Sequence, residues 1–95
     1  MDLKKIVFSG HAVRRMFERQ ISKTYIQDII IGGEIIKEYP EDKPFPSYLV
    51  LGYVKERPLH IVIAMNSLTE TCYVITVYDP DPVNWKRNFK SRRKK

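Results

Sequence analysis

Two apolar runs separated by a polar segment dominate the second half of the chain. They are LHIVIAM at 59–65 and CYVITVY at 72–78, with NSLTET at 66–71 between them. Short runs rich in β-branched and aromatic residues on either side of a turn-like segment predict an antiparallel hairpin, and runs apolar on both faces belong in the middle of a sheet. The register that best matches apolar residues places Ile61 opposite Val77 and Ile63 opposite Ile75. It also sets His60 opposite Tyr78 on the second face of the sheet.

The N-terminal third predicts a short strand and two helices. The run KKIVF at 4–8 is the strand, and Ser9 is a suitable N-cap for a helix that begins near His11. Apolar residues at helical spacing in this helix predict an inward face made of Val13, Met16 and Phe17. A second helix, capped by Ser22, runs to about Ile31 and ends at Gly32–Gly33.

Two more strands and a sharp stop complete the pattern. The segments EIIKEY at 34–39 and YLVLGYV at 48–54 predict strands, with a proline-rich loop between them. A three-residue turn at 55–57 would place Gly52 across from His60. After Tyr78 the sequence DPDP ends the sheet, and Asp81 predicts the cap of a short helix through Trp85.

Together these elements predict an α+β fold. A short N-terminal strand and two helices pack on one face of a largely antiparallel sheet of four to five strands, followed by a short C-terminal helix and a basic tail. The helix-covered face is expected to consist of Leu51, Ile61, Ile63, Ile75 and Val77. The opposite face is expected to hold the site. We expect one domain over residues 1–85 and a separate tail over residues 86–95.

The charge is concentrated in that tail. Residues 86–95 hold seven of the seventeen basic residues and no acids, so the first 85 residues carry ten basic against eleven acidic residues, about −1. Such a run suits phosphate contacts, although it is equally suited to a solvated terminus.

The sequence has few residues that could form a disulfide or bind a metal, and no segment that could span a membrane. The chain has one cysteine, Cys72, and two histidines, and it has no C-x-x-C or H-x-x-x-H spacing. We therefore expect no metal, no cofactor and no disulfide. No apolar stretch resembles a signal peptide or a membrane span, so a cytoplasmic protein without a membrane partner is expected.

His60 and Tyr78 form the first candidate for chemistry. A histidine in a buried strand is costly unless its nitrogens are paired, and its ordinary pKa allows proton transfer near neutral pH. The alternative is a core histidine that is hydrogen-bonded to Tyr78 or to the backbone.

A row of cations on the first helix is the second candidate. Positions four apart align His11, Arg15 and Arg19, a row that suits an extended anion. Arg57, on the predicted turn, could reach the same cleft. Each of these arginines could instead form an ordinary surface salt bridge or remain solvated.

Imidazole, phenol and guanidinium groups are the set that metal-free RNA cleavage requires. A base activates the 2′-OH, cations hold the charge that builds on phosphorus, and an acid protonates the leaving oxygen. The same groups would also make a non-catalytic phosphate-binding surface.

Four segments of the sequence carry a resemblance to a known family: HAVRRMFER at 11–19, GEIIKEYPEDKPFPSYLVLGY at 33–53, RPLHIV at 57–62 and VITVYDPDPVNW at 74–85. They resemble an uncharacterised bacterial family with the motifs HAxxRMxxR, GxIIxxYPxDxPxPSxL, PLHxV and ITVYxPDxxxW. Members of that family resemble toxins of type II toxin–antitoxin pairs, in the MqsR and RelE fold group of mRNA interferases.

The resemblance implies a metal-independent mRNA endoribonuclease that halts translation and is neutralised by a cognate antitoxin, often one with an MqsA/YgiT-type zinc finger. The ribosome is a further candidate partner. The motif positions carried over are His11, Arg15, Arg19, His60 and Tyr78. We expect His60 to act as general base, Tyr78 or His11 to assist as acid, and Arg15 and Arg19 to clamp the scissile phosphate.

Two other functions fit the same residues. One is a non-catalytic RNA- or ribosome-binding module with structural histidines. The other is a protein-interaction domain that binds its partner through an exposed sheet edge.

Overall fold

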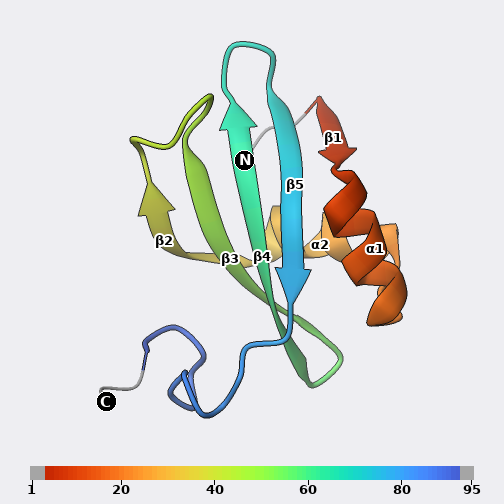
Figure 1. Cartoon of the computed structure of the whole chain (residues 1–95), viewed down its shortest axis with the longest axis vertical. Helices are drawn as coiled ribbons and strands as arrows, with labels where there is room; N and C mark the ends of the chain where they lie inside the picture. The colour runs from red at the N-terminus through yellow and green to blue at the C-terminus, as the bar shows by residue number, and fades with distance from the viewer. Residues whose placement is uncertain (1–3, 93–95) are drawn as a thin grey trace.

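Five strands and two helices make up residues 4–92, which the computed structural model describes (Figure 1). In chain order they are β1 (Lys5–Phe8), α1 (Gly10–Glu18), α2 (Lys23–Gly32), β2 (Glu34–Tyr39), β3 (Ser47–Val54), β4 (Arg57–Asn66) and β5 (Thr71–Tyr78). The strands form one sheet in the order β1-β5-β4-β3-β2. Strand β1 pairs with β5 in parallel, and the other neighbours are antiparallel. The predicted α+β class is confirmed.

Both helices begin at the predicted caps. The Ser9 hydroxyl accepts a hydrogen bond from the backbone N–H of Ala12 at 3.0 Å, and the Ser22 hydroxyl accepts one from Tyr25 at 3.3 Å. These bonds satisfy backbone donors that have no partner inside a helix. Helix α2 ends at its C-cap Gly33, as the sequence predicts.

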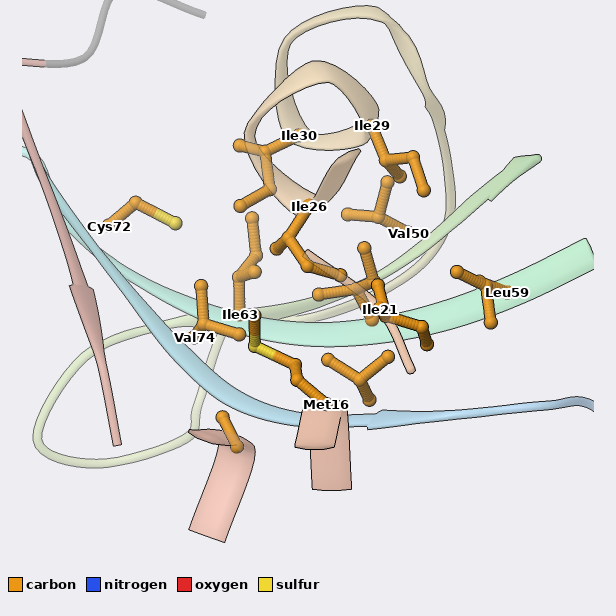
Figure 2. Packing of buried hydrophobic residues seen from close by; sticks show 13 residues of the cluster. Met16, Ile21, Ile26, Ile29, Ile30, Val50, Leu59, Ile63, Cys72 and Val74 are labelled. Atoms are coloured by element: carbon orange, nitrogen blue, oxygen red, sulfur yellow. The ribbon is translucent and has the colours of Figure 1, made fainter. Parts of the chain in front are cut away.

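The core fills the space between the helices and one face of the sheet (Figure 2). Helix α2 packs against β3, and α1 lies beside β5. The buried residues of the core come from both helices, the link between them and the three central strands: Ala12, Met16, Ile21, Ile26, Ile29, Ile30, Val50, Leu59, Ile61, Ile63, Cys72, Val74 and Val77. The predicted partners Ile61 and Val77 do pair, and so do His60 and Tyr78.

The turn between β3 and β4 is shorter than predicted. Val54 pairs with Arg57, so the turn has two residues, and Gly52 lies opposite Leu59 instead of His60. A shift of one residue moves every side chain of a strand to the other face. Leu51, predicted on the helix-covered face, therefore pairs with His60 on the opposite face.

An irregularity in β5 changes a second prediction. Ile63 pairs with Val74, not with Ile75, because the register between β4 and β5 shifts after Val62. The extra residue in β5 displaces Ile75 from the core, and 40% of its surface is exposed.

Helix α1 buries a narrower stripe than its sequence predicts. Ala12 and Met16 are buried, whereas Val13 is 43% exposed and Phe17 is 85% exposed. Ser9 bonds through its backbone and its hydroxyl to carbonyl groups of β5. Those bonds hold α1 beside the edge of β5, so only one side of the helix faces the core.

The C-terminal segment, residues 80–92, contains turns in place of the predicted short helix. The Asp81 carbonyl accepts bonds from the N–H groups of Asn84 and Trp85, which close a single turn, and the Asp81 carboxylate caps it at Val83. The chain then folds back, with the Lys86 N–H donating to Ser91 O. Residues 93–95 of the predicted tail lie outside the described residues.

The close approach of α2 to β3 depends on Gly52. A Cβ built at Gly52 would lie 2.3 Å from Ile29 Cγ2, whereas one at Gly32 would meet nothing within 4 Å. We predict that Gly52→Ala lowers the free energy of unfolding by about 1–3 kcal/mol through overpacking. The control Gly32→Ala should be neutral or stabilising by up to about 1 kcal/mol. Urea denaturation of the two variants measures the difference, and equal stabilities would contradict this packing account.

Candidate functional site

His60 is buried in the centre of the sheet with both ring nitrogens bonded. Its exposed fraction is 0%. Nδ1 lies 3.1 Å from the Tyr78 hydroxyl, and Nε2 lies 2.7 Å from the backbone carbonyl oxygen of Phe89. The predicted His60–Tyr78 pair is therefore a direct hydrogen bond between neighbouring strands.

These two contacts select the tautomer of the neutral ring. The Phe89 carbonyl can only accept, so Nε2 carries the hydrogen, and in the neutral ring Nδ1 accepts from the Tyr78 hydroxyl. Burial lowers the pKa of His60, and the bond to Phe89 opposes that shift only in part. The ring is therefore a neutral imidazole whose Nδ1 accepts the Tyr78 hydrogen bond.

The C-terminal segment covers His60 from the side opposite the helices. The Trp85 ring packs edge-on against the imidazole with centroids 4.4 Å apart, and only 7% of Trp85 is exposed. Trp85 thus covers the imidazole as a lid. Because Trp85 and Phe89 close off the ring, solvent reaches the pair through Tyr78, which is partly exposed.

Tyr78 opens onto a cavity of about 240 Å³, which we call the Tyr78 pocket. It lies between β2, β3, β5 and the C-terminal segment, and its lining is Ile36, Lys37, Tyr39, Leu49, Tyr78, Trp85, Lys90 and Arg92. Three of these side chains are cationic and none is a carboxylate. The pocket therefore favours an anion that carries an apolar or aromatic group.

The cations of the pocket are held by contacts of their own. Lys37 Nζ lies 5.4 Å from the centroid of the Tyr39 ring, and the Arg92 guanidinium lies 5.3 Å from that of Trp85. Lys90 pairs with Glu34 at 3.0 Å. Burial raises the pKa of Tyr78, and the positive charge of Arg92 opposes that shift. Tyr78 therefore keeps its proton near neutral pH.

Arg19 and Arg57 meet at a different place, around Asp79. Arg57 binds both carboxylate oxygens of Asp79, at 2.7 and 2.9 Å, and donates to the Arg19 carbonyl at 2.9 Å. Arg19 Nε lies 3.3 Å from Asp79 Oδ2 but forms no aligned hydrogen bond. This cluster joins the end of α1, the start of β4 and the end of β5.

The remaining predicted residues make separate contacts. His11 Nε2 lies 3.0 Å from the Thr76 hydroxyl, and Arg15 pairs with Glu18 at 3.5 Å. Helix α1 ends at Glu18 with Arg19 as its C-cap, so the predicted row of His11, Arg15 and Arg19 does not continue along one helix. None of these three residues lines the Tyr78 pocket, and their functional role stays a prediction.

Sequence reasoning missed the residues that surround Tyr78. Lys37 comes from an edge strand, and Lys90 and Arg92 come from the segment after the sheet. No regular spacing in the sequence relates the three residues. The only signal was the concentration of basic residues in 86–95. Phe89 contributes a backbone carbonyl, which no side-chain pattern can reveal.

Residues 8–79 match a protein family described as a domain of unknown function, DUF4258. The chain belongs to the DUF4258 family. The DUF4258 match includes His60 and Tyr78 and ends at Asp79, so Lys90 and Arg92 lie beyond it. No curated protein and no solved structure matches this chain.

Three further features are absent from the described part of the DUF4258 chain: a cluster of metal ligands, a reactive thiol and a membrane-spanning helix. Among residues 4–92, no three His, Cys, Asp or Glu side chains form a group that could hold a metal ion. Burial raises the pKa of the Cys72 thiol to about 11, which keeps it unreactive. No helix in the described part of the chain is long and apolar enough to cross a membrane.

The Asp79 cluster predicts a pH dependence of stability. Hydrogen bonding from Arg57 lowers the pKa of Asp79 below its ordinary value. A carboxyl group with a lower pKa in the folded state stabilises the protein above its unfolded pKa of about 3.9, and that contribution is lost as pH falls through the folded value. Asp79→Asn should therefore be less stable than wild type at pH 7, with the gap closing at acidic pH.

Urea denaturation at pH 7 and at low pH measures this gap. The control is Glu56→Gln, which removes the same charge from the exposed residue next to Arg57. A gap between wild type and Asp79→Asn that stays constant with pH would contradict a role for the ionised carboxylate.

Proposed function

We propose that this chain is an endoribonuclease that cleaves mRNA in the cytoplasm by side-chain proton transfer, without a metal ion. The observation that carries the proposal is the hydrogen-bond chain from Phe89 O through His60 to Tyr78, whose outer end opens onto a cationic pocket. The sequence resemblance to mRNA interferases of toxin–antitoxin pairs supports the same activity.

Tyr78 is the group that contacts the substrate in this mechanism. The ribose 2′-OH donates its proton to the Tyr78 oxygen while Tyr78 passes its own proton to His60 Nδ1. The 2′ oxygen then attacks phosphorus and the bond to the 5′ oxygen breaks, which leaves a 2′,3′-cyclic phosphate and a 5′-hydroxyl. His60 acts through Tyr78 and is a positioning residue and proton acceptor.

The protonated state of His60 is accommodated by the same two contacts. Once charged, the ring donates from Nε2 to Phe89 O and from Nδ1 to the Tyr78 oxygen, so neither N–H is left unpaired. Proton transfer therefore requires no movement of the imidazole.

The cations of the Tyr78 pocket supply the other two functions that cleavage requires, stabilisation of negative charge and protonation of the leaving group. Lys37, Lys90 and Arg92 can hold the charge that develops on the phosphoryl oxygens. A lysine ammonium in the pocket can protonate the leaving 5′ oxygen. The alternative predicted from the sequence is that Arg15 and Arg19 bind the scissile phosphate, with Arg57 beside Arg19.

We further propose that the activity makes this chain the toxin of a type II toxin–antitoxin pair. This rests on the resemblance alone, which implies inhibition of translation and a neutralising antitoxin, often one with an MqsA/YgiT-type zinc finger. The ribosome is the other partner to test.

The complete burial of His60 favours one alternative. Both nitrogens are bonded within the protein, as expected for a structural histidine. In that case the cationic pocket belongs to a non-catalytic RNA- or ribosome-binding module. RNA binding that weakens with salt, without cleavage even when ribosomes are present, would support this alternative.

We predict that Tyr78→Phe lowers RNA cleavage about 10²- to 10⁴-fold, because the ring remains but the proton donor and acceptor is lost. His60→Ala should have a similar effect. The matched control is Tyr73→Phe, a second tyrosine of β5 that stacks on Phe45. Growth and total RNA after induced expression measure the effect: arrest with fragmented mRNA is expected for wild type and the control only. Arrest by Tyr78→Phe at the wild-type level would overturn the mechanism.

A second comparison separates the two sets of cations. If the Tyr78 pocket binds the phosphate, Arg92→Ala lowers cleavage by at least about tenfold. Arg15→Ala should then have little effect, because Arg15 does not line that pocket and pairs with Glu18. Initial rates on the same RNA, with circular dichroism to confirm folding, measure both. The reverse result would restore the α1 arginines as the phosphate clamp.

A further inference from the structure

A second cavity, of about 320 Å³, lies between α2 and β3. We call it the Tyr25–Tyr53 pocket, and its lining is Tyr25, Asp28, Ile29, Gly32, Gly33, Gly52 and Tyr53. It shares no residue with the Tyr78 pocket. Gly52 faces the helices while Tyr78 and His60 face away from them, so the two cavities belong to opposite faces of the sheet.

One stripe of α2 forms the first wall of this pocket. Tyr25, Asp28 and Gly32 follow one another at three- and four-residue spacing, which places them on one side of the helix. Ile29 belongs to the same stripe and packs toward Val50 of β3 in the core (Figure 2). Gly52 allows the helix to approach β3 closely, and Tyr53 then forms the second wall.

The polar chemistry of the pocket is that of a cation site. Among residues 4–92, no side chain pairs with the Asp28 carboxylate through an ion pair or hydrogen bond, and the two tyrosines are 42% and 52% exposed. A carboxylate beside the Tyr25 ring of the same helix stripe suits a planar cation, because a guanidinium stacks on aromatic faces and binds a carboxylate through two N–H groups. A phosphate would be repelled. This charge is opposite to that of the Tyr78 pocket.

The backbone beside the pocket offers a second point of attachment. Pairing of β3 with β2 begins at Leu51 and Glu34, so Gly52, Tyr53 and Val54 have no strand on that side. Tyr53 pairs on its other side with Pro58, which has no N–H. In an antiparallel ladder with this alternation, the N–H and C=O of Tyr53 point toward the open edge. An extended peptide can bond to them.

We propose that the Tyr25–Tyr53 pocket binds an arginine side chain of a protein partner, carried on an extended segment that pairs with β3 at Tyr53. The guanidinium stacks on the Tyr25 ring and pairs with Asp28, and the peptide backbone bonds to the Tyr53 backbone. This interaction is independent of RNA cleavage, and it would survive if the proposed nuclease activity were disproved.

Amide chemical shifts of the full-length chain test the proposal. The probe is the peptide acetyl-Gly-Arg-Gly-amide, and the control probe is the same peptide with norleucine in place of arginine. The arginine peptide should cause saturable shifts of the Gly32, Gly33, Gly52 and Tyr53 amides, and the norleucine peptide should not. Asp28→Asn should weaken binding by about tenfold or more, through loss of a charge-assisted pair. Glu38→Gln, which removes an exposed carboxylate of β2, should leave it unchanged.

Three results would overturn the proposal. One is the absence of saturable shifts at these amides. A second is equal shifts with both peptides, which would indicate an apolar groove. The third is that guanosine monophosphate shifts these amides while the arginine peptide does not, which would make the pocket a base-binding site. Asp28 makes no side-chain contact that folding needs, so loss of binding in Asp28→Asn reports on the pocket.

Discussion

The burial of one imidazole with two hydrogen bonds is the interaction on which the arrangement of this protein depends. An unpaired polar group in the centre of a sheet would cost free energy, so His60 requires a partner at each nitrogen. Tyr78 supplies one from the neighbouring strand, and Phe89 supplies the other from the C-terminal segment. The bond to Phe89 holds that segment against the sheet, where Lys90 and Arg92 line the pocket onto which Tyr78 opens. Stability and the proposed chemistry thus use the same contacts.

Local signals made the elements of the fold predictable. The caps Ser9 and Ser22, the glycines at the end of α2 and the apolar hairpin each act over a few residues, and each is confirmed. The face of the sheet on which a side chain lies was less predictable, because a register shift of one residue reverses it. A two-residue turn in place of a three-residue one moved Leu51 to the other face of the sheet, and an irregularity in β5 exposed Ile75.

The candidate site was predictable only where it lies within one hairpin. His60 and Tyr78 are neighbours in a regular antiparallel pair, so alternation placed them together. The cations around them come from β2 and from a turn-rich segment, and such contacts follow from tertiary folding. Arg15 and Arg19 were attractive in sequence because they align with His11 at four-residue spacing, and Arg57 because it is next to the PLHxV motif. In the folded chain Asp79 pairs with two of them, which gives them a structural role that no periodicity could show.

The most direct test of the central claim is the chemistry of the RNA ends that the purified protein produces. RNA is incubated with the protein in EDTA at neutral pH, with and without ribosomes, and the fragments are analysed by mass spectrometry. Activation of the 2′-OH by Tyr78 and His60 predicts fragments that end in 2′,3′-cyclic phosphate and begin with a 5′-hydroxyl. Intact RNA under both conditions, or fragments ending in a 3′-hydroxyl, would contradict it.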